Sequence, residues 1–290
     1  MALRAPALVR EFSEPIEQKL HLLETKTPLD FEAVTAAIAR IRDPEQLRSR
    51  LGHAIRYSQR VEAEVGDLGI ETLLPQATDD YVGRFLTTWM PDELGHARAQ
   101  DQLLRALDLP VYESRPIDHI PVHNRIAGTL GTVSAHVYEI VSMMYHSIGA
   151  INERLAMGAY RQMTSIIEQL GEDELAEALM NPMRRDEAAH LGYYRTYARQ
   201  LRPRLRSWQL AMVRGVIVRT YAPVGAGKAA DKAPMGRALQ SMEMDPHDRT
   251  FGSAVEEIAD ELLGKPGRRL PPFVQTSLQH CVDLARREDN

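Results

Sequence analysis

The feature that most constrains this 290-residue sequence is a pair of Asp-Glu-x-x-His motifs, at residues 92–96 and 186–190. A lone Glu-x-x-His is expected by chance roughly 0.8 times in a chain of this composition. With the preceding Asp the expectation falls to roughly 0.05, and two copies occur in about one chain in a thousand. Because positions i and i+3 share a helix face, the Glu and His of each motif can bind one centre together.

Helix signals dominate the chain, and no alternating strand pattern or hairpin turn appears, so we predict an all-α fold. Capping residues, prolines and apolar periodicity place helices at about 13–24, 31–42, 44–74, 79–109, 131–170, 172–202, 204–221, 250–264 and 271–287. The Pro-rich residues 110–123 are expected to form a crossover loop, and the Gly/Pro/Lys-rich residues 222–236 a mobile loop. Pro182 should kink the helix that contains it.

These elements predict a single domain in three parts. Residues 1–43 form an N-terminal helical extension, and residues 44–222 form a four-helix bundle with a flanking fifth helix. Residues 223–290 form a loop and helices packed on that bundle. The four bundle helices are expected at 44–74, 79–109, 131–170 and 172–202, with each motif inside one of them.

Hairpin geometry selects a carboxylate on the helix preceding the second motif. In an antiparallel pair, residues equidistant from the turn lie at the same height, so a turn at Gly171 matches Glu187 to a position near 155. Glu153 fits this height. Glu139 lies roughly 21 Å further along the helix and does not fit.

The same argument applies to the first motif. A turn near residues 75–77 matches Glu93 to a position near 59. Glu62 is the nearest acid, and Glu64 is the alternative. The resulting set of candidate metal ligands is Glu62, Glu93, His96, Glu153, Glu187 and His190.

Carboxylate and imidazole ligands in this ratio suit iron or manganese better than zinc or copper. Asp92 and Asp186 precede the two motif glutamates. Each Asp is expected to accept a hydrogen bond from a ligand imidazole, which would orient the ring and raise its basicity.

The residues around the motifs resemble the ferritin-like di-iron carboxylate superfamily, whose bundles carry such Glu-x-x-His pairs. The similar segments are Thr-Trp-Met-Pro-Asp-Glu-Leu-Gly-His at 88–96, Asn-Glu-Arg at 152–154 and Asp-Glu-Ala-Ala-His at 186–190. The branch is that of acyl-carrier-protein desaturases, multicomponent monooxygenases, arylamine N-oxygenases and ribonucleotide reductase small subunits. Trp89, four residues before the first motif Glu, is similar to the desaturase pattern.

The resemblance implies two iron ions, or manganese or a mixed Mn/Fe pair, bridged by Glu93 and Glu187. Glu62 and His96 would bind one ion, and Glu153 and His190 the other. It also implies an oxygen-activating enzyme that desaturates, hydroxylates or N-oxygenates a small or carrier-bound substrate. Its partners would be dioxygen and an electron donor of the ferredoxin or reductase type. The resemblance leaves open whether the chain forms a homodimer.

The chain departs from the family pattern in two respects: at the residues before the motif histidines, and at Pro182, which interrupts the fourth helix just before the site. The family often has Arg immediately before each motif His, where this chain has Gly95 and Ala189. Neither position is a predicted ligand. Because of these departures, no particular substrate is assigned from the resemblance.

Five further residues lie at helical spacing from the predicted ligands and are candidates to line a substrate pocket. They are Trp89, His146, Gly149, Met157 and Tyr194. Core packing explains each of them as well. For His146 the alternatives are a group beside the metal, a third ligand, or a satisfied core histidine, which we favour.

Composition excludes several other classes of protein. The net charge of -5 argues against binding driven by phosphate neutralisation in a nucleic acid, and a single cysteine excludes an internal disulfide. No apolar signal core or membrane-length apolar run appears, which favours a cytoplasmic protein. Two alternatives to an oxygenase stay open: a ferritin-like iron storage or detoxification protein, and a helical scaffold without metal.

Overall fold

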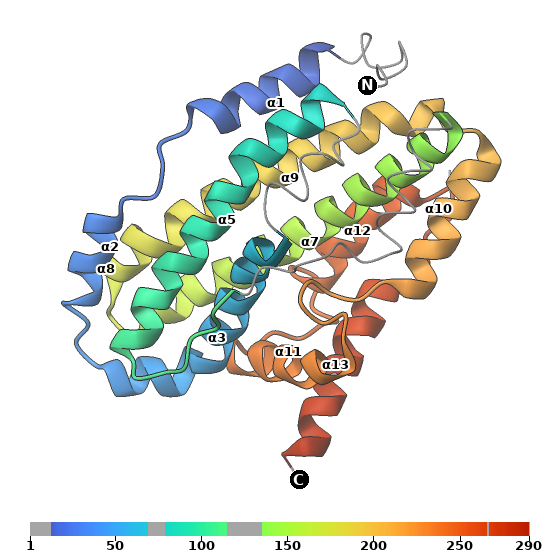
Figure 1. Cartoon of the computed structure of the whole chain (residues 1–290). Coiled ribbons are helices and arrows are strands. Elements are labelled where there is room, and N and C mark those ends of the chain that lie inside the picture. Colours follow the sequence, from blue (N-terminus) through green and yellow to red (C-terminus); the bar gives the residue numbers. More distant parts are fainter. Residues whose placement is uncertain (1–12, 69–78, 115–134, 266, 290) are drawn as a thin grey trace.

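The computed structural model of the protein describes residues 13–68, 79–114, 135–265 and 267–289 (Figure 1). Every named element in these residues is a helix, and the one β contact among them is an isolated bridge between Lys265 and Arg268. The prediction of an all-α fold is therefore confirmed for this part of the chain. Residues 110–114 carry no helix, and the rest of the predicted crossover loop lies outside the described residues.

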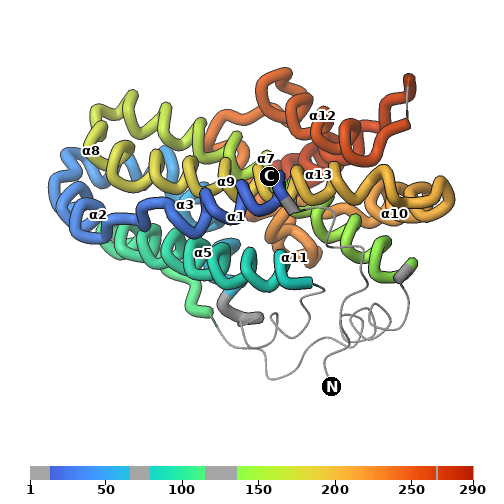
Figure 2. Tube along the Cα trace, turned by 90° about the horizontal axis from the view of Figure 1, so that it is seen from above, coloured from blue at the N-terminus to red at the C-terminus, as the bar shows by residue number. Residues whose placement is uncertain are grey.

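The long helices of the described chain are α3 (Pro44–Leu68), α5 (Asp80–Ala106), α7 (Ala135–Gln169) and α9 (Asn181–Leu201). Helix α3 packs along α5, and α7 packs along α9. The four helices lie side by side (Figures 1 and 2). Their buried residues include much of the apolar core and the Glu and His of both Asp-Glu-x-x-His motifs. The turn predicted between α3 and α5 lies outside the described residues.

Asp79 fixes the start of α5 in two ways. Its Oδ1 accepts a hydrogen bond from the backbone N–H of Val82 at 2.8 Å, as expected for an N-terminal capping residue. Its Oδ2 accepts hydrogen bonds from the hydroxyl groups of Tyr138 on α7 and Tyr197 on α9. One carboxylate thus links three of the long helices at the same end.

Gly171 forms the turn between α7 and the fourth long helix, as predicted. Its φ of 79° lies in the left-handed region, where glycine is favoured because it has no Cβ. The chain then continues through the short helix α8 (Asp173–Leu175) and the π-helical segment η3 (Ala176–Met180) into α9.

Pro182 lies directly after the π-helical segment. A proline ring would collide with the carbonyl four residues earlier in a regular α-helix. The wider π turn places that carbonyl elsewhere, so the helix continues instead of ending. The predicted irregularity is present, but it takes the form of a π segment before Pro182.

Two shorter helices precede the bundle: α1 (Ser13–Thr25) and α2 (Phe31–Ile38). Helix α1 packs on α5 and α9 (Figure 2), and α2 packs on α5 and on the start of the fourth helix. Asp30 caps α2 by accepting hydrogen bonds from the backbone N–H groups of Glu32 and Ala33. Helix α2 ends four residues before the predicted position.

After the 3-10 turn η4 (Arg202–Arg204), the C-terminal part contains α10 (Ser207–Thr220), α11 (Ala229–Ser241), α12 (Gly252–Leu263) and α13 (Phe273–Glu288). Helix α11 corrects part of the prediction of a loop over residues 222–236: residues 222–228 carry no helix, but residues 229–236 are helical. Pro234 and Gly236 favoured a loop in the sequence, but α11 buries Met235, Ala238 and Leu239 against α3 and α13. This tertiary burial outweighs the local preference of two helix-breaking residues.

None of the described helices has the length and apolarity needed to cross a membrane.

Gly236 offers a test of the packing between α11 and α13. A Cβ at this position would overlap the carbonyl group of Cys281, which is backbone and cannot rotate away. We expect Gly236→Val to lower the free energy of unfolding by about 2 kcal/mol or more, as for other overpacked cores. Denaturant titration measures this, and Gly227→Ala is the control because nothing lies within 4 Å of a Cβ there. Equal stability of the two variants would contradict the close crossing.

Candidate metal centre

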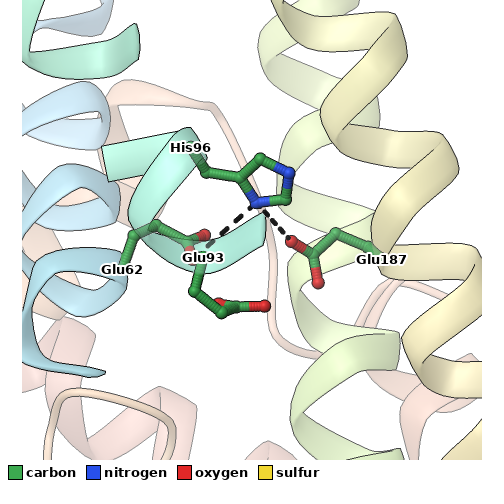
Figure 3. A group of neighbouring side chains, drawn as sticks. All are labelled: Glu62, Glu93, His96 and Glu187. Atoms are coloured by element: carbon green, nitrogen blue, oxygen red, sulfur yellow. Dashed lines mark ion pairs between the residues drawn. The ribbon is translucent and has the colours of Figure 1, made fainter. Parts of the chain in front are cut away.

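The six predicted ligand residues come together in the middle of the bundle. Each of the four long helices contributes at least one of them, and all six are buried. Helix α3 carries Glu62, α5 carries Glu93 and His96, α7 carries Glu153, and α9 carries Glu187 and His190. Figure 3 shows Glu62, Glu93, His96 and Glu187 pointing toward one another from α3, α5 and α9.

The six residues form two overlapping groups. Glu62 and His96 belong to the first group and Glu153 and His190 to the second, while Glu93 and Glu187 belong to both. Within each group the potential ligand atoms all lie within 4.8 Å of one another. Two metal ions that share two carboxylates would need this arrangement of donors.

Both imidazole rings present the same nitrogen to the cluster. Nδ1 of His96 lies 3.3 Å from Oε1 of Glu187, and Nδ1 of His190 lies 3.2 Å from Oε1 of Glu93. Nδ1 of His96 also lies 3.9 Å from Oε2 of Glu62, and Figure 3 marks both contacts of this ring. The Nε2 atoms point the other way, toward carboxylates outside the cluster.

Several buried polar atoms of the cluster have no hydrogen-bond partner among the described residues. They are Oε2 of Glu62, Oε1 of Glu93, Nδ1 of His96, Oε1 of Glu187 and Nδ1 of His190. Buried polar atoms are nearly always hydrogen-bonded, since an unpaired one is costly. A metal ion would satisfy such atoms together, so these residues fit a metal centre. The oxygen-rich donor set suits iron or manganese.

Asp92 and Asp186 contact the two histidines in a crossed pattern. Oδ2 of Asp186 lies 3.3 Å from Nε2 of His96, and Oδ2 of Asp92 lies 3.1 Å from Nε2 of His190. Each aspartate therefore orients the imidazole of the other motif, on the opposite helix. A hydrogen bond from Nε2–H leaves the lone pair of each ring on Nδ1, which faces the cluster.

Lys26, which the sequence did not single out, connects these two aspartates. Its Nζ lies 2.7 Å from Oδ1 of Asp92 and 2.9 Å from Oδ1 of Asp186, and its side chain is 11% exposed. Lys26 follows the last residue of α1, so the packing of α1 on α5 and α9 places its side chain beside the two aspartates. No local pattern in the sequence could have indicated this contact.

Burial and mutual repulsion strongly affect the ionisation of the cluster without metal. Burial, together with the charge of Glu93, raises the pKa of Glu62 well above its usual range, and burial with the charge of Glu187 does the same for Glu153. Burial also acts to raise the pKa of Glu187, but its close contacts with Glu153, His190 and His96 outweigh burial and lower that pKa. The metal-free cluster thus holds protons where metal ions would otherwise balance its charge.

The pKa values of both motif histidines are raised. Burial acts to lower the pKa of His96, but the hydrogen bond to Asp186 and the nearby carboxylate of Glu187 raise it to about 9. For His190, burial is likewise outweighed by the hydrogen bond to Asp92 and the nearby carboxylates of Glu187 and Glu93, which raise its pKa. Both shifts favour the protonated ring when no metal is bound, and each ring must lose a proton to become a ligand.

Glu64, the alternative to Glu62, points away from the cluster. It belongs to neither group, and its Oε1 accepts a hydrogen bond from Arg60 at 2.7 Å on the same helix. Glu62 is instead fully enclosed and accepts a hydrogen bond from the hydroxyl of Tyr160 on α7. Tyr160, which the sequence did not indicate, also exchanges a 2.8 Å hydrogen bond with Ser58.

His146 is a packed core residue. Its Nδ1 lies 2.7 Å from the backbone oxygen of Ser142, and its ring stacks on Tyr197 with centroids 3.7 Å apart. It lies in neither group of potential ligands. The ring is buried in the core, as favoured from the sequence, but it is satisfied at Nδ1 only, because Nε2 has no hydrogen-bond partner among the described residues.

The other predicted pocket residues also have packing roles. Gly149 leaves room for the ring of Tyr194, which a Cβ would meet, and the Tyr194 hydroxyl lies 3.2 Å from that of Tyr145. Trp89 stacks on Phe85 at 6.0 Å, while Met157 is partly exposed. None of these residues lines the apolar cavity beside Glu62 in the described part of the chain.

Comparisons of the chain with protein-family models, with curated proteins and with solved structures find no match. The geometry of the cluster therefore carries the functional argument by itself.

Lys26 should matter for both halves of the cluster. Replacing it in Lys26→Met leaves Asp92 and Asp186 close together without their cation, which should lower the free energy of unfolding by on the order of 3 kcal/mol. It should also weaken ferrous iron binding by about 10-fold or more, because both imidazoles lose a fixed partner. Titration of the metal-free protein with ferrous iron, followed by denaturant unfolding, measures both effects.

Lys19→Met is the matched control for this experiment, since Lys19 is a partly exposed lysine of α1 outside the cluster. Lys26→Arg keeps the charge and should recover part of the stability. Iron binding by Lys26→Met equal to that of the control would show that the aspartates hold the rings without Lys26.

His146 gives a pH-dependent prediction, because burial lowers its pKa to about 4. An unfolded histidine takes up a proton near pH 6.5, whereas folded His146 stays neutral until about pH 4. The unfolded state thus binds more protons between these values, so His146 should cost up to about 3 kcal/mol of stability as the pH falls from 7 to 4. His146→Phe should lose this part of the pH dependence in denaturant titrations, and the exposed His247→Gln should retain it. An unchanged slope in His146→Phe would contradict the neutral buried ring.

Proposed function

We propose that this chain is an oxygen-activating non-haem di-iron oxidase or oxygenase of the ferritin-like type, acting on a small organic or acyl substrate. The observation that carries the proposal is the sharing of Glu93 and Glu187 between two buried groups of potential ligands. A mononuclear site needs no shared carboxylates, and a solvated acidic surface would not bury them. The arrangement of α3, α5, α7 and α9 around the cluster supports the ferritin-like assignment.

In this proposal Glu62 and His96 would bind one iron ion, and Glu153 and His190 the other, with Glu93 and Glu187 between them. Four ionised carboxylates carry four negative charges, which two ferrous ions balance. Loading with metal would therefore displace the protons held by the buried carboxyl groups. The net formal charge of the four carboxylates and two ferrous ions together would be zero. Manganese in one or both positions suits the same donors.

Bound iron would supply the electrons and the open positions that activate dioxygen, which no amino-acid side chain can do. The protein's own residues have three tasks. Asp92 and Asp186 keep Nε2 of each imidazole occupied, so that Nδ1 stays directed into the cluster. The packed apolar core excludes water from the site. Tyr160 holds one oxygen of Glu62, which leaves the other directed toward His96.

Turnover of such a centre requires electrons from outside the chain, so the proposal includes a ferredoxin- or reductase-type electron donor. The substrate class within this proposal is an uncharged organic or acyl group that undergoes desaturation, hydroxylation or N-oxygenation.

Iron stoichiometry tests the proposal most directly. The protein is prepared metal-free, loaded anaerobically with ferrous iron, and analysed for metal per chain. We expect about two ions, falling below one in Glu93→Ala and in Glu187→Ala because each removes a carboxylate from both groups. Glu64→Ala is the matched control on α3 and should still bind two.

The same preparation distinguishes the alternatives. Exposure of the loaded protein to air should consume dioxygen and change its visible absorption, while the iron content stays near two. Uptake of many ions per chain would instead show iron storage. Unchanged loading in Glu93→Ala and Glu187→Ala would overturn the assignment of the cluster, and no loading of the parent chain would indicate a scaffold.

A further inference from the structure

An apolar cavity lies directly beside the candidate metal centre, and none of the residues that the sequence suggested for a pocket lines it. It has a volume of about 60 Å³, and it is lined by residues of α3, α7 and α11 together with Val224 and Phe251. Glu62, one of the proposed ligands, and its hydrogen-bonded neighbour Tyr160 form part of its wall. The cavity therefore reaches the first of the two groups of potential ligands.

Apart from the carboxylate of Glu62, the walls of the cavity offer little for a polar molecule to bind, and Oε2 of Glu62 is directed toward His96. The hydroxyls of Ser58 and Tyr160 are hydrogen-bonded to each other, and that of Tyr57 donates to the backbone oxygen of Val224 at 2.6 Å. The other lining side chains are alanine, valine, leucine, methionine and phenylalanine. An uncharged apolar occupant fits this lining, whereas a charged or strongly hydrogen-bonding group would lose its water without replacement.

Small side chains create the space. Ala54 on α3, Ala156 and Ala159 on α7, and Ala238 on α11 line the cavity at the place where these helices meet. Empty space in a core lowers stability because its lining loses packing contacts. Larger apolar residues would fill it, so its persistence is better explained by an occupant than by packing.

The C-terminal part of the chain completes the cavity. Arg60 donates a hydrogen bond at 2.8 Å to the backbone oxygen of Gly225, and a Cβ at Gly225 would collide with Val61. With a φ of 73°, this glycine allows the segment before α11 to lie directly on α3. The bundle alone would leave this side of Glu62 uncovered.

We propose that this cavity binds a small apolar part of the substrate, a group of a few carbon atoms such as the end of an alkyl chain, next to Glu62. This inference rests on the proposed function, since the metal centre gives the bound group its chemical role. A single water needs only ~10–15 Å³, and a cavity of about 150 Å³ holds benzene, so the observed volume suits a group of intermediate size. Methionine side chains in the wall adapt readily to different shapes.

Three methionines of the wall make the proposal directly measurable: Met163, Met235 and Met242. In metal-free protein labelled with ¹³C at the methionine methyl groups, xenon is the probe, because it is apolar and fits a cavity of this size. We expect saturable shifts of these three methyl signals. Met90 and Met183 are buried but do not line the cavity, so their signals are the internal control.

Filling variants establish where the probe binds. Ala159→Leu and Ala238→Leu should abolish the xenon shifts, while Ala33→Leu, at a partly buried alanine of α2 remote from the cavity, should preserve them. All three should still bind about two ferrous ions per chain, because none alters a ligand. Two filling variants are used so that a folding defect in one leaves the other as the test.

A matched titration with propane shows whether an alkyl group of a few carbon atoms enters the same cavity. Shifts of the same three signals, lost in the filling variants, would support the proposal. Xenon shifts without propane shifts would overturn it, since the cavity would then exclude carbon chains. Absence of both, or shifts of Met90 and Met183 of equal size, would also overturn it. Failure of the proposed function appears separately, as failure to load iron in the parent chain.

Discussion

The burial of four glutamates and two histidines at one place is the constraint on which the rest of this structure depends. Isolated charges are very unfavourable in a protein interior, so such a cluster persists only if protons or metal ions balance it. The structure shows both aspects of this requirement. Glu62 and Glu153 have raised pKa values, and several atoms that face the centre of the cluster have no hydrogen-bond partner among the described residues.

Because the cluster draws on four helices, its geometry depends on how those helices are joined and held. Gly171 permits the tight turn that brings Glu153 and Glu187 to the same height. Asp79 links α5, α7 and α9 at one end through its hydrogen bonds with two tyrosines. The π-helical segment before Pro182 lets the fourth helix continue to its motif. Each of these three features keeps a helix that carries cluster residues at the right height relative to its neighbours.

The two ends of the chain complete opposite sides of the centre. On one side, Lys26 binds both aspartates that orient the imidazoles, so the N-terminal extension stabilises the cluster directly. On the other side, α11 and the segment before it cover Glu62 and line a mostly apolar cavity. Charge is therefore balanced where the imidazoles are held, and the cavity wall on the other side is mostly apolar. On the proposed function, this arrangement would keep the metal ligands ordered and an apolar substrate group away from water.

The sequence by itself determined the all-helical fold, most helix boundaries and five of the six residues that meet in the bundle, with Glu62 preferred to Glu64 for the sixth. These follow from local rules: capping by Asp30 and Asp79, the i, i+3 spacing within each motif, and equal distances from a turn. The tertiary structure alone decided the contacts between segments far apart in the chain. It places Glu62 in the cluster and leaves Glu64 outside it. It pairs each aspartate with the histidine of the other motif, and it brings Lys26 to the two aspartates and Tyr160 to Glu62. It also formed α11 despite Pro234 and Gly236, because burial against α3 and α13 outweighs helix propensity, and no local pattern records that burial.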